Sequence, residues 1–136
     1  MTVFVDTSAW FAAVFRRDKY NSDAKRLLSV GPLVTSDHVV VETWMLIANR
    51  LNLEAANVFV ANLLASPTTI ELADVDDIRA AETIRLNYPD QSFSLVDRTS
   101  FVVMQRLGLT RVISFDNDFV IYRYGANRDQ AFEVLR

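Results

Sequence analysis

Residues 2–10 read TVFVDTSAW, an apolar run that ends abruptly on an acid. Segment 2–5 is β-branched and aromatic, which is typical of a buried strand. The acid is Asp6, and segment 9–15 behind it is apolar almost all round, as in a buried helix. The start of the chain therefore predicts a strand, an abrupt turn and a helix.

Asp6 stands at the junction of this strand and helix, and two interpretations fit it. Asp6, Thr7 and Ser8 are all helix-capping residue types, because a side-chain oxygen accepts from an unpaired N–H of the first turn. Alternatively, Asp6 is an active-site carboxylate at the carboxyl end of a strand, where open α/β folds bind ligands. This stretch alone favours the cap, because caps are common.

Strand-like and helix-like segments alternate along the rest of the chain. The expected strands are 33–35, 69–72, 111–115 and 131–135. A long helix capped by Ser36 or Asp37 is expected to end near residue 51. The other expected helices are 22–30, 53–65, 74–87 and 95–107, with a turn or short helix at 116–119. This alternation predicts an α/β fold with three α/β/α layers around a mostly parallel central sheet. The length of 136 residues predicts a single domain over 1–136.

The composition and charge exclude several classes of protein. The absence of cysteine excludes a disulfide framework, a thiol nucleophile and a thiolate metal site, and it fits a reducing cytosol. With no leader-like segment and no apolar run of membrane-spanning length, a cytoplasmic protein without membrane association is expected. The net charge of −3 argues against a broad basic surface for nucleic acid, although a local cluster of acids would give the same total.

Glu42 is the second acid in an unexpected place, because it lies on an apolar face of the long helix 37–51. Three of the four residues one helical turn away from it are apolar, and the fourth is His38. An ionised carboxylate there is unfavourable unless it is paired or binds a metal. The alternative is that Glu42 reaches solvent or pairs with Arg50.

Asp97 follows Ser94 at the spacing of a capping box, in which the serine caps the helix and the acid answers from its third position. That local role is sufficient to explain Asp97. Asp116 and Asp118 come directly after the expected strand 111–115, where a polar turn or a helix cap is again an adequate explanation.

The acids are more informative together than singly, since several fall at strand ends or first helical turns of one small α/β domain. If they converge, their mutual repulsion must be offset, and without a cation their pKa values would rise. Oxygen ligands without cysteine or a histidine cluster favour a hard cation, Mg²⁺ or Mn²⁺.

The ordered acidic motifs resemble those of the PIN domain. The matching stretches are FVDTSAW at the N-terminus, VVVETW around Glu42, FSLVDRTSF around Asp97 and VISFDNDF around Asp116. The short chain and its ending AFEVL are most similar to the VapC toxins of bacterial and archaeal toxin–antitoxin pairs. The resemblance implies a metal-dependent ribonuclease that acts as a toxin and hydrolyses RNA phosphodiester bonds with a metal-activated water.

The resemblance also implies roles for individual residues. The catalytic and metal-binding carboxylates would be Asp6, Glu42, Asp97 and Asp116, while Asp118 is a less certain fifth acid because DND leaves the register ambiguous by two residues. Hydroxyl groups supporting these carboxylates would come from Thr7, Ser8 and Ser94. His38 lies one turn before Glu42 and could line the site, but the reaction needs no histidine.

Partners are expected from the same resemblance. Arg16, Arg17 and Lys19 follow the first helix and are candidate contacts for RNA phosphates, although a solvated loop also explains them. The VapC-like family implies a homodimer and an antitoxin that binds through a C-terminal helix or tail. The alternative function is a PIN-like scaffold that has lost catalysis and serves as a binding module.

Overall fold

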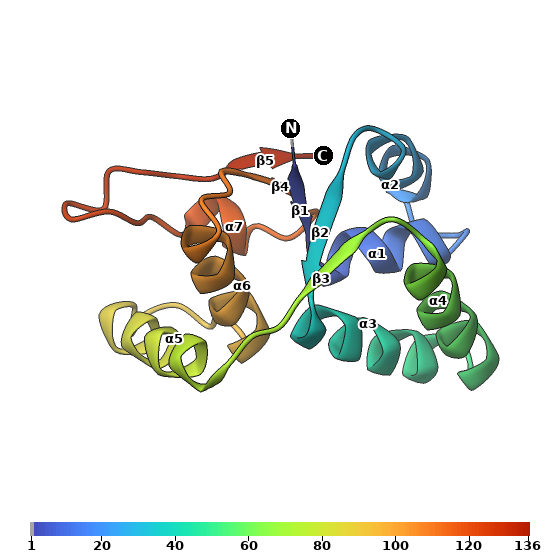
Figure 1. The fold of residues 1–136 in the computed structure, drawn as a ribbon, viewed down its shortest axis with the longest axis horizontal. Helices are drawn as coiled ribbons and strands as arrows, with labels where there is room; N and C mark the ends of the chain where they lie inside the picture. Colours follow the sequence, from blue (N-terminus) through green and yellow to red (C-terminus); the bar gives the residue numbers. More distant parts are fainter. Residues whose placement is uncertain (1) are drawn as a thin grey trace.

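The structure, a computed structural model, describes residues 2–136 (Figure 1). Within this range the chain forms, in order, β1 (Val3–Val5), α1 (Thr7–Val14), α2 (Asn21–Leu28), β2 (Leu33–Ser36), α3 (Asp37–Arg50), α4 (Leu53–Ala65), β3 (Thr69–Glu71), α5 (Val75–Asn87), α6 (Leu95–Arg106), β4 (Arg111–Ile113), α7 (Asp118–Ile121) and β5 (Glu133–Leu135).

The strands form one five-stranded sheet in the order β3-β2-β1-β4-β5, and every pairing in it is parallel. Phe4 of the central strand pairs with Val34 on one side and Val112 on the other. The chain moves outward from β1 to β3 and then returns to start β4 on the other flank of β1. The strand order therefore reverses between β1 and β4, which is where open α/β sheets bind ligands.

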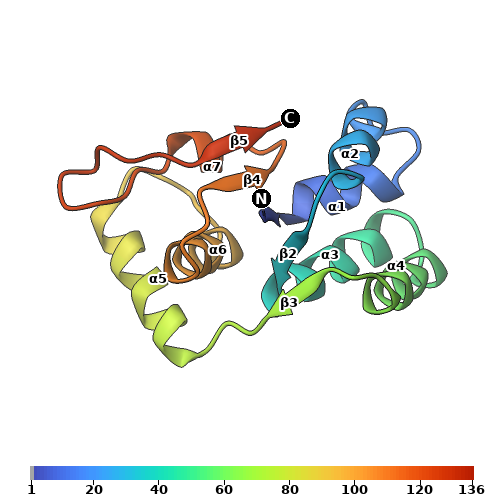
Figure 2. The same cartoon turned by 45° about the horizontal axis from the view of Figure 1, so that its top comes forward.

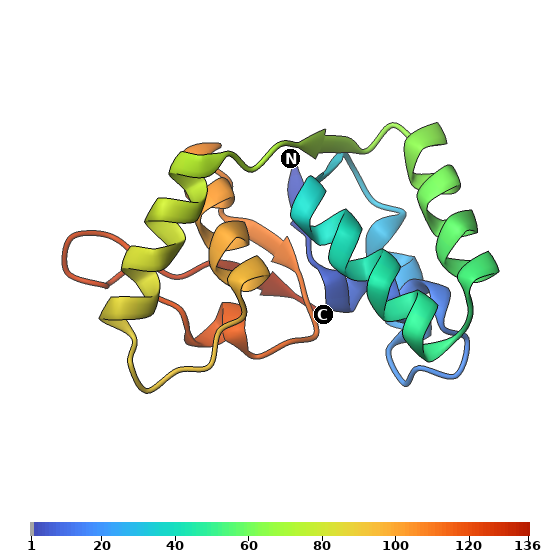
Figure 3. The ribbon, with the colours of Figure 1, turned by 90° about the horizontal axis from the view of Figure 1, so that it is seen from below.

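The helices cover both faces of this sheet, as the three views show. Helices α1 to α4 lie on one side and α5 to α7 on the other (Figures 1, 2 and 3). Right-handed crossovers produce this division, because a chain that progresses across the sheet in opposite directions places its helices on opposite faces. The three-layer α/β/α architecture expected from the sequence is confirmed.

The core that holds these layers is built from the apolar runs that the sequence marks. Phe4 and Val5 of β1 are fully buried, and Phe101 of α6 packs against the other face with its ring centroid 4.2 Å from that of Tyr122. Arg98 is also buried and donates from Nη1 to the carbonyl of Ala81 at 3.0 Å, which ties α6 to α5.

The expected element boundaries differ from the observed ones by a few residues. Helix α1 begins at Thr7 rather than Ala9, because Asp6 caps it from the preceding position. Ser36, not Asp37, caps α3. The last strand is shorter than expected and covers Glu133–Leu135. Across residues 2–136, every helix is too short or too polar to span a membrane.

Candidate active site at the carboxyl edge of the sheet

Asp6 lies at the end of the central strand and is almost inaccessible to solvent, with 4% of its surface exposed. Its Oδ1 accepts from the Ser8 hydroxyl at 2.7 Å and from the Ala9 N–H at 3.2 Å. Its Oδ2 accepts from the Ser114 hydroxyl at 2.7 Å. The carboxylate is thus both the cap of α1 and a fixed group at the edge of the sheet, so the two interpretations of Asp6 are compatible.

Ser114 is a site residue that sequence reasoning missed. It follows β4 directly, is buried, and receives the Asp116 N–H on the same hydroxyl oxygen at 3.1 Å. The Ser8 hydroxyl oxygen likewise accepts the Phe115 N–H at 2.9 Å. The two serines therefore join the end of β1 to the end of β4. The available signal was a hydroxyl residue within two positions of an acid at a strand end, as in segment 6–8.

Asp97 lies on the third residue of α6, and the capping box is present in full. The Asp97 N–H donates to the Ser94 Oγ at 3.0 Å, and the Ser94 N–H donates to the Asp97 Oδ2 at 3.3 Å. The local role inferred from the sequence is confirmed, yet it is not the whole role of this carboxylate.

Asp97, Asp116 and Asp118 form the acid triad, in which one carboxylate oxygen from each residue lies within 4.8 Å of the other two. The Asp118 N–H donates to the Asp116 Oδ1 at 3.0 Å, which fixes the turn between them. Both acids of DND therefore place a carboxylate oxygen at the triad.

Burial and crowding of like charges shift the pKa values at this edge. Burial, followed by the neighbouring carboxyl group of Asp118 and the charges of Asp116 and Asp6, raises the pKa of Asp97 to about 8. Burial also raises the pKa of Asp6 to about 6, against the lowering effect of its hydrogen bonds. The pKa of Asp116 is raised, again mainly by burial. Among the ion pairs of residues 2–136, none provides these carboxylates with a basic partner.

Glu42 stands beside the triad rather than in it. Its Oε1 accepts from the Thr7 hydroxyl at 2.6 Å, so the residue next to Asp6 holds it. Of the four carboxylates expected to converge, Asp97 and Asp116 lie in the triad, Asp6 is close enough to raise the pKa of Asp97, and Glu42 is linked through Thr7. The contact of Glu42 is thus with Thr7 and not with Arg50, which the sequence offered as an alternative partner.

Beside Glu42 is a hollow of about 810 Å³ between α3 and the start of α6, named here the α3 hollow. His38 lines it and makes a 3.1 Å contact from Nδ1 to the Thr99 hydroxyl of α6. Val41, Met45 and Leu95 line it as well, and they are 58%, 60% and 44% exposed. Although Met45 lies on a mostly apolar helix, its side chain therefore faces solvent.

The basic residues after α1 lie on an exposed loop that approaches the same edge. Arg16, Arg17 and Lys19 are exposed, and the Lys19 ammonium stands 4.9 Å from the ring centroid of Tyr20. Tyr20 in turn stacks on Phe115, with ring centroids 4.5 Å apart. Since Phe115 immediately precedes Asp116, this stack brings the loop to the triad.

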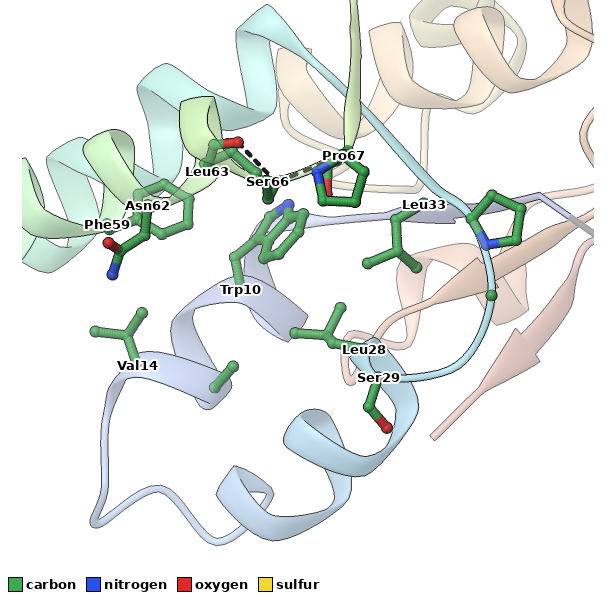
Figure 4. A pocket seen from close by; sticks show the side chains of 14 residues that line it. Trp10, Val14, Leu28, Ser29, Leu33, Phe59, Asn62, Leu63, Ser66 and Pro67 are labelled. Atoms are coloured by element: carbon green, nitrogen blue, oxygen red, sulfur yellow. Dashed lines mark hydrogen bonds between the residues drawn. The ribbon is translucent and has the colours of Figure 1, made fainter.

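A second cavity, of about 500 Å³, lies away from the acids and is named here the Trp10 cavity. Trp10, Leu28 and Phe59 line it, together with residues that precede β2 and β3, so it belongs to the amino edge of the sheet. Figure 4 shows its largely apolar side chains. The acid triad and the Trp10 cavity are therefore separate sites on the molecule.

Comparisons with known proteins place this geometry in context. Residues 3–125 match the PIN domain. The chain is 35% identical over 119 residues to the 23S rRNA-specific endonuclease VapC20 of Mycobacterium tuberculosis, which covers 86% of this chain and 91% of the relative. The crystal structure of that VapC20, described as a sarcin-ricin loop cleaving toxin, has a TM-score of 0.82 at 34% identity and covers 87% of this chain and 92% of that one.

Two more distant solved structures share the fold. FitAcB from Neisseria gonorrhoeae has a TM-score of 0.69 at 20% identity, covering 100% of this chain and 97% of that one. A toxin–antitoxin complex from Klebsiella pneumoniae has a TM-score of 0.62 at 16% identity, covering 85% and 88%. At these identities the likeness shows the fold alone.

Proposed function

This chain belongs to the PIN domain family, and we propose that it is a divalent-metal-dependent ribonuclease acting as the toxin of a toxin–antitoxin pair. The observation that carries the proposal is the acid triad beside Asp6, at the point where the strand order reverses. The identity of 35% to an rRNA endonuclease toxin supports the same substrate class, RNA.

The donor set fits a hard divalent cation. The triad offers three carboxylate oxygens within 4.8 Å of one another, and oxygen is the ligand type that Mg²⁺ and Mn²⁺ prefer. The raised pKa of Asp97 indicates carboxylates brought together without a basic neighbour, which a cation would stabilise in their charged form. We propose Asp97, Asp116 and Asp118 as the direct ligands, with Asp6 and Glu42 at their margin.

A bound cation would supply Lewis-acid polarisation of the phosphate and a more acidic water. The rest of the proposed chemistry belongs to groups of this chain. The hydroxyls of Ser8 and Ser114 keep Asp6 in one orientation, and the Thr7 hydroxyl does so for Glu42. The Ser94 N–H orients Asp97. Carboxylates fixed in this way are pre-organised to accept protons and hold ligands without rearrangement.

The RNA is proposed to approach over the loop that carries Arg16, Arg17 and Lys19. These exposed cations offset the negative charge of the acids for an incoming phosphate backbone. The Tyr20–Phe115 stack fixes the loop next to Asp116.

An antitoxin is proposed to cover both the Trp10 cavity and the acid centre. Helix α1 connects them, since Thr7 at its start bonds Glu42 and Val14 at its end lines the cavity (Figure 4). Its 8 residues span about 12 Å, a distance that a short tail can cross. An amphipathic helix would fill the cavity, and a C-terminal tail with an arginine would reach the carboxylates.

Asn62 is exposed and lines the Trp10 cavity, so Asn62→Trp tests the antitoxin proposal with little risk to the fold. The variant should remain toxic but escape rescue by the co-expressed antitoxin. Ala61→Trp, one residue away on α4 and outside the cavity lining, is the matched control and should be rescued.

A homodimer is proposed through the α3 hollow, because Val41, Met45 and Leu95 are apolar and largely exposed there. Met45→Glu should give monomers by sedimentation analysis, whereas Val58→Glu on α4, also exposed, should leave the dimer intact. A monomeric wild type would contradict this assembly.

The central test is cleavage of total RNA by the purified protein with Mg²⁺ or Mn²⁺, and with a chelator as control. Products should appear only with a cation, and Asp118→Asn should slow cleavage by at least about 100-fold, the upper range for losing a group that merely supports a ligand. A folded wild type that cleaves no RNA and is not stabilised by either cation would favour the inactive binding scaffold instead.

A further inference from the structure

The last strand ends beside a basic residue, Arg136, at the same edge of the sheet as the acids. Strand β5 pairs parallel with β4, with Ile113 opposite Leu135. The Ser114 N–H donates to the Leu135 carbonyl at 3.2 Å, which continues the pairing one residue beyond β4. Arg136 therefore lies at the carboxyl edge, beside the turn that carries two acids of the triad.

Arg136 is held to that turn by a neutral group. Its Nη1 donates to the Asn117 Oδ1 at 3.1 Å, and Asn117 is the residue between Asp116 and Asp118. Arg136 is exposed and takes no part in the ion pairs of residues 2–136. An amide orients a guanidinium without neutralising it, so the full positive charge and most of its N–H donors stay available.

From this placement we propose that Arg136 is a positioning residue that holds an RNA phosphate next to the acid centre. The inference rests on the proposed ribonuclease function. A polyanion that approaches buried carboxylates needs a compensating cation at the rim, and a guanidinium matches the geometry of a phosphate with paired donors. Lys19 approaches the same turn through the Tyr20–Phe115 stack, so the two cations flank residues 115–117 from two elements.

The test measures RNA binding in the Asp97→Asn background, so that cleavage does not interfere. A labelled single-stranded RNA of mixed sequence is titrated without divalent cations at several concentrations of monovalent salt. Arg136→Gln should weaken binding at low salt and reduce the slope of log K against log salt by about 0.7, the value for one phosphate contact on a single strand. Arg136→Lys should keep the slope, because it keeps the charge.

Arg79→Gln is the matched control, since Arg79 is exposed on α5 and pairs with Asp76. Its salt slope should equal that of the parent. In the active enzyme, Arg136→Gln should raise KM and leave kcat nearly unchanged, which a general loss of structure would not do. Equal slopes for Arg136→Gln and Arg79→Gln would overturn the inference. Wild-type RNA cleavage measured alongside reports separately on the proposed function, because the binding slopes do not depend on catalysis.

Discussion

Helices α5 and α6 begin with the same capping motif, but the pKa values of the aspartates in the two motifs shift in opposite directions. Each starts with a capping box whose third helical residue is an aspartate, Asp77 in α5 and Asp97 in α6. Burial, the largest single effect, raises the pKa of Asp77, but the hydrogen bonds from Arg106 and Asp74 and the charge of Arg106 together outweigh it and lower that pKa. Burial and the other acids raise the pKa of Asp97 to about 8.

The difference lies in what the rest of the fold brings to each carboxylate. Arg106 donates to Asp77 with two nitrogens, at 3.1 and 3.0 Å, and to Glu71 with a third at 2.9 Å. Asp97 instead meets Asp116 and Asp118. A local motif therefore explains why an acid stands at a helix start, and only its distant neighbours decide between a structural ion pair and a metal-type site.

The largest expected effect separates the two acids by activity. Asp97→Asn should reduce RNA cleavage by more than about 100-fold, because it removes a proposed ligand. Asp77→Asn should leave the cleavage rate within about a factor of two, since Asp77 belongs to the ion pair with Arg106. Single-turnover cleavage assays and growth arrest on expression measure both. Equal losses in the two variants would mean that capping, not ligation, accounts for Asp97.

A second prediction concerns the ion pair between Asp77 of α5 and Arg106 of α6. Arg106→Gln leaves Asp77 buried without its counter-charge and should lower the free energy of unfolding by about 2 kcal/mol. The estimate is below that for a fully buried pair, because the Arg106 side chain is 38% exposed. Urea unfolding measures it. Arg79→Gln, which breaks an exposed pair with Asp76 on α5, is the control and should change the stability by close to zero. A near-zero change for Arg106→Gln would show that Asp77 needs no partner.

The third prediction concerns pH in the absence of divalent cations. The folded protein keeps a proton on Asp97 over a pH range in which the unfolded chain has lost it. The contribution of this protonated group to stability is therefore fully present below about pH 4. It should then fall as the pH rises to about 8. Asp97→Asn stays neutral, so at pH 8 it should be more stable than the wild type.

Thermal melts of both proteins in chelator across this range measure the effect. Asp77→Asn should instead be less stable than the wild type at neutral pH, because the lowered pKa of Asp77 stabilises the wild-type fold there. Parallel wild-type and Asp97→Asn curves from pH 4 to pH 8 would contradict the raised pKa of Asp97.

The contrast between Asp77 and Asp97 also shows how far the sequence can be read. The periodicity of apolar residues and the turn residues predicted the five strands and helices α1 to α6 in order, because these signals are local, whereas segment 116–119 was expected as either a turn or a short helix. The capping box at Ser94 and Asp97 was likewise visible. The guanidinium of Arg106 lies 29 residues from Asp77, and no local pattern indicates that contact.

The acid site was predicted in part for the same reason. Strand ends identified Asp6 and Asp116, since parallel strands bring their carboxyl ends to one edge. The membership of Asp118 depends on the turn geometry, and the place of Glu42 beside the triad depends on one hydroxyl from Thr7. The Ser114 contact with Asp6 joins residues 108 apart, which only the folded sheet specifies.

The smallest expected effect tests the two caps themselves. Asp74 accepts the Asp77 N–H at 2.9 Å in α5, and Ser94 accepts the Asp97 N–H at 3.0 Å in α6. Asp74→Ala and Ser94→Ala should each lower the free energy of unfolding by about 1 kcal/mol, the usual loss for a missing cap. By stability alone, the two variants should look alike.

Their activities should differ, because only one cap holds a proposed ligand. Ser94→Ala frees the start of α6 and loosens Asp97, which should reduce cleavage by about 10-fold, the lower range for a group that orients a metal ligand. Asp74→Ala should leave cleavage at the wild-type rate. Ser94→Thr, which keeps the hydroxyl, should restore both stability and activity. If Ser94→Ala lost stability but kept full activity, the orientation of Asp97 would come from its neighbours in the triad and not from the cap.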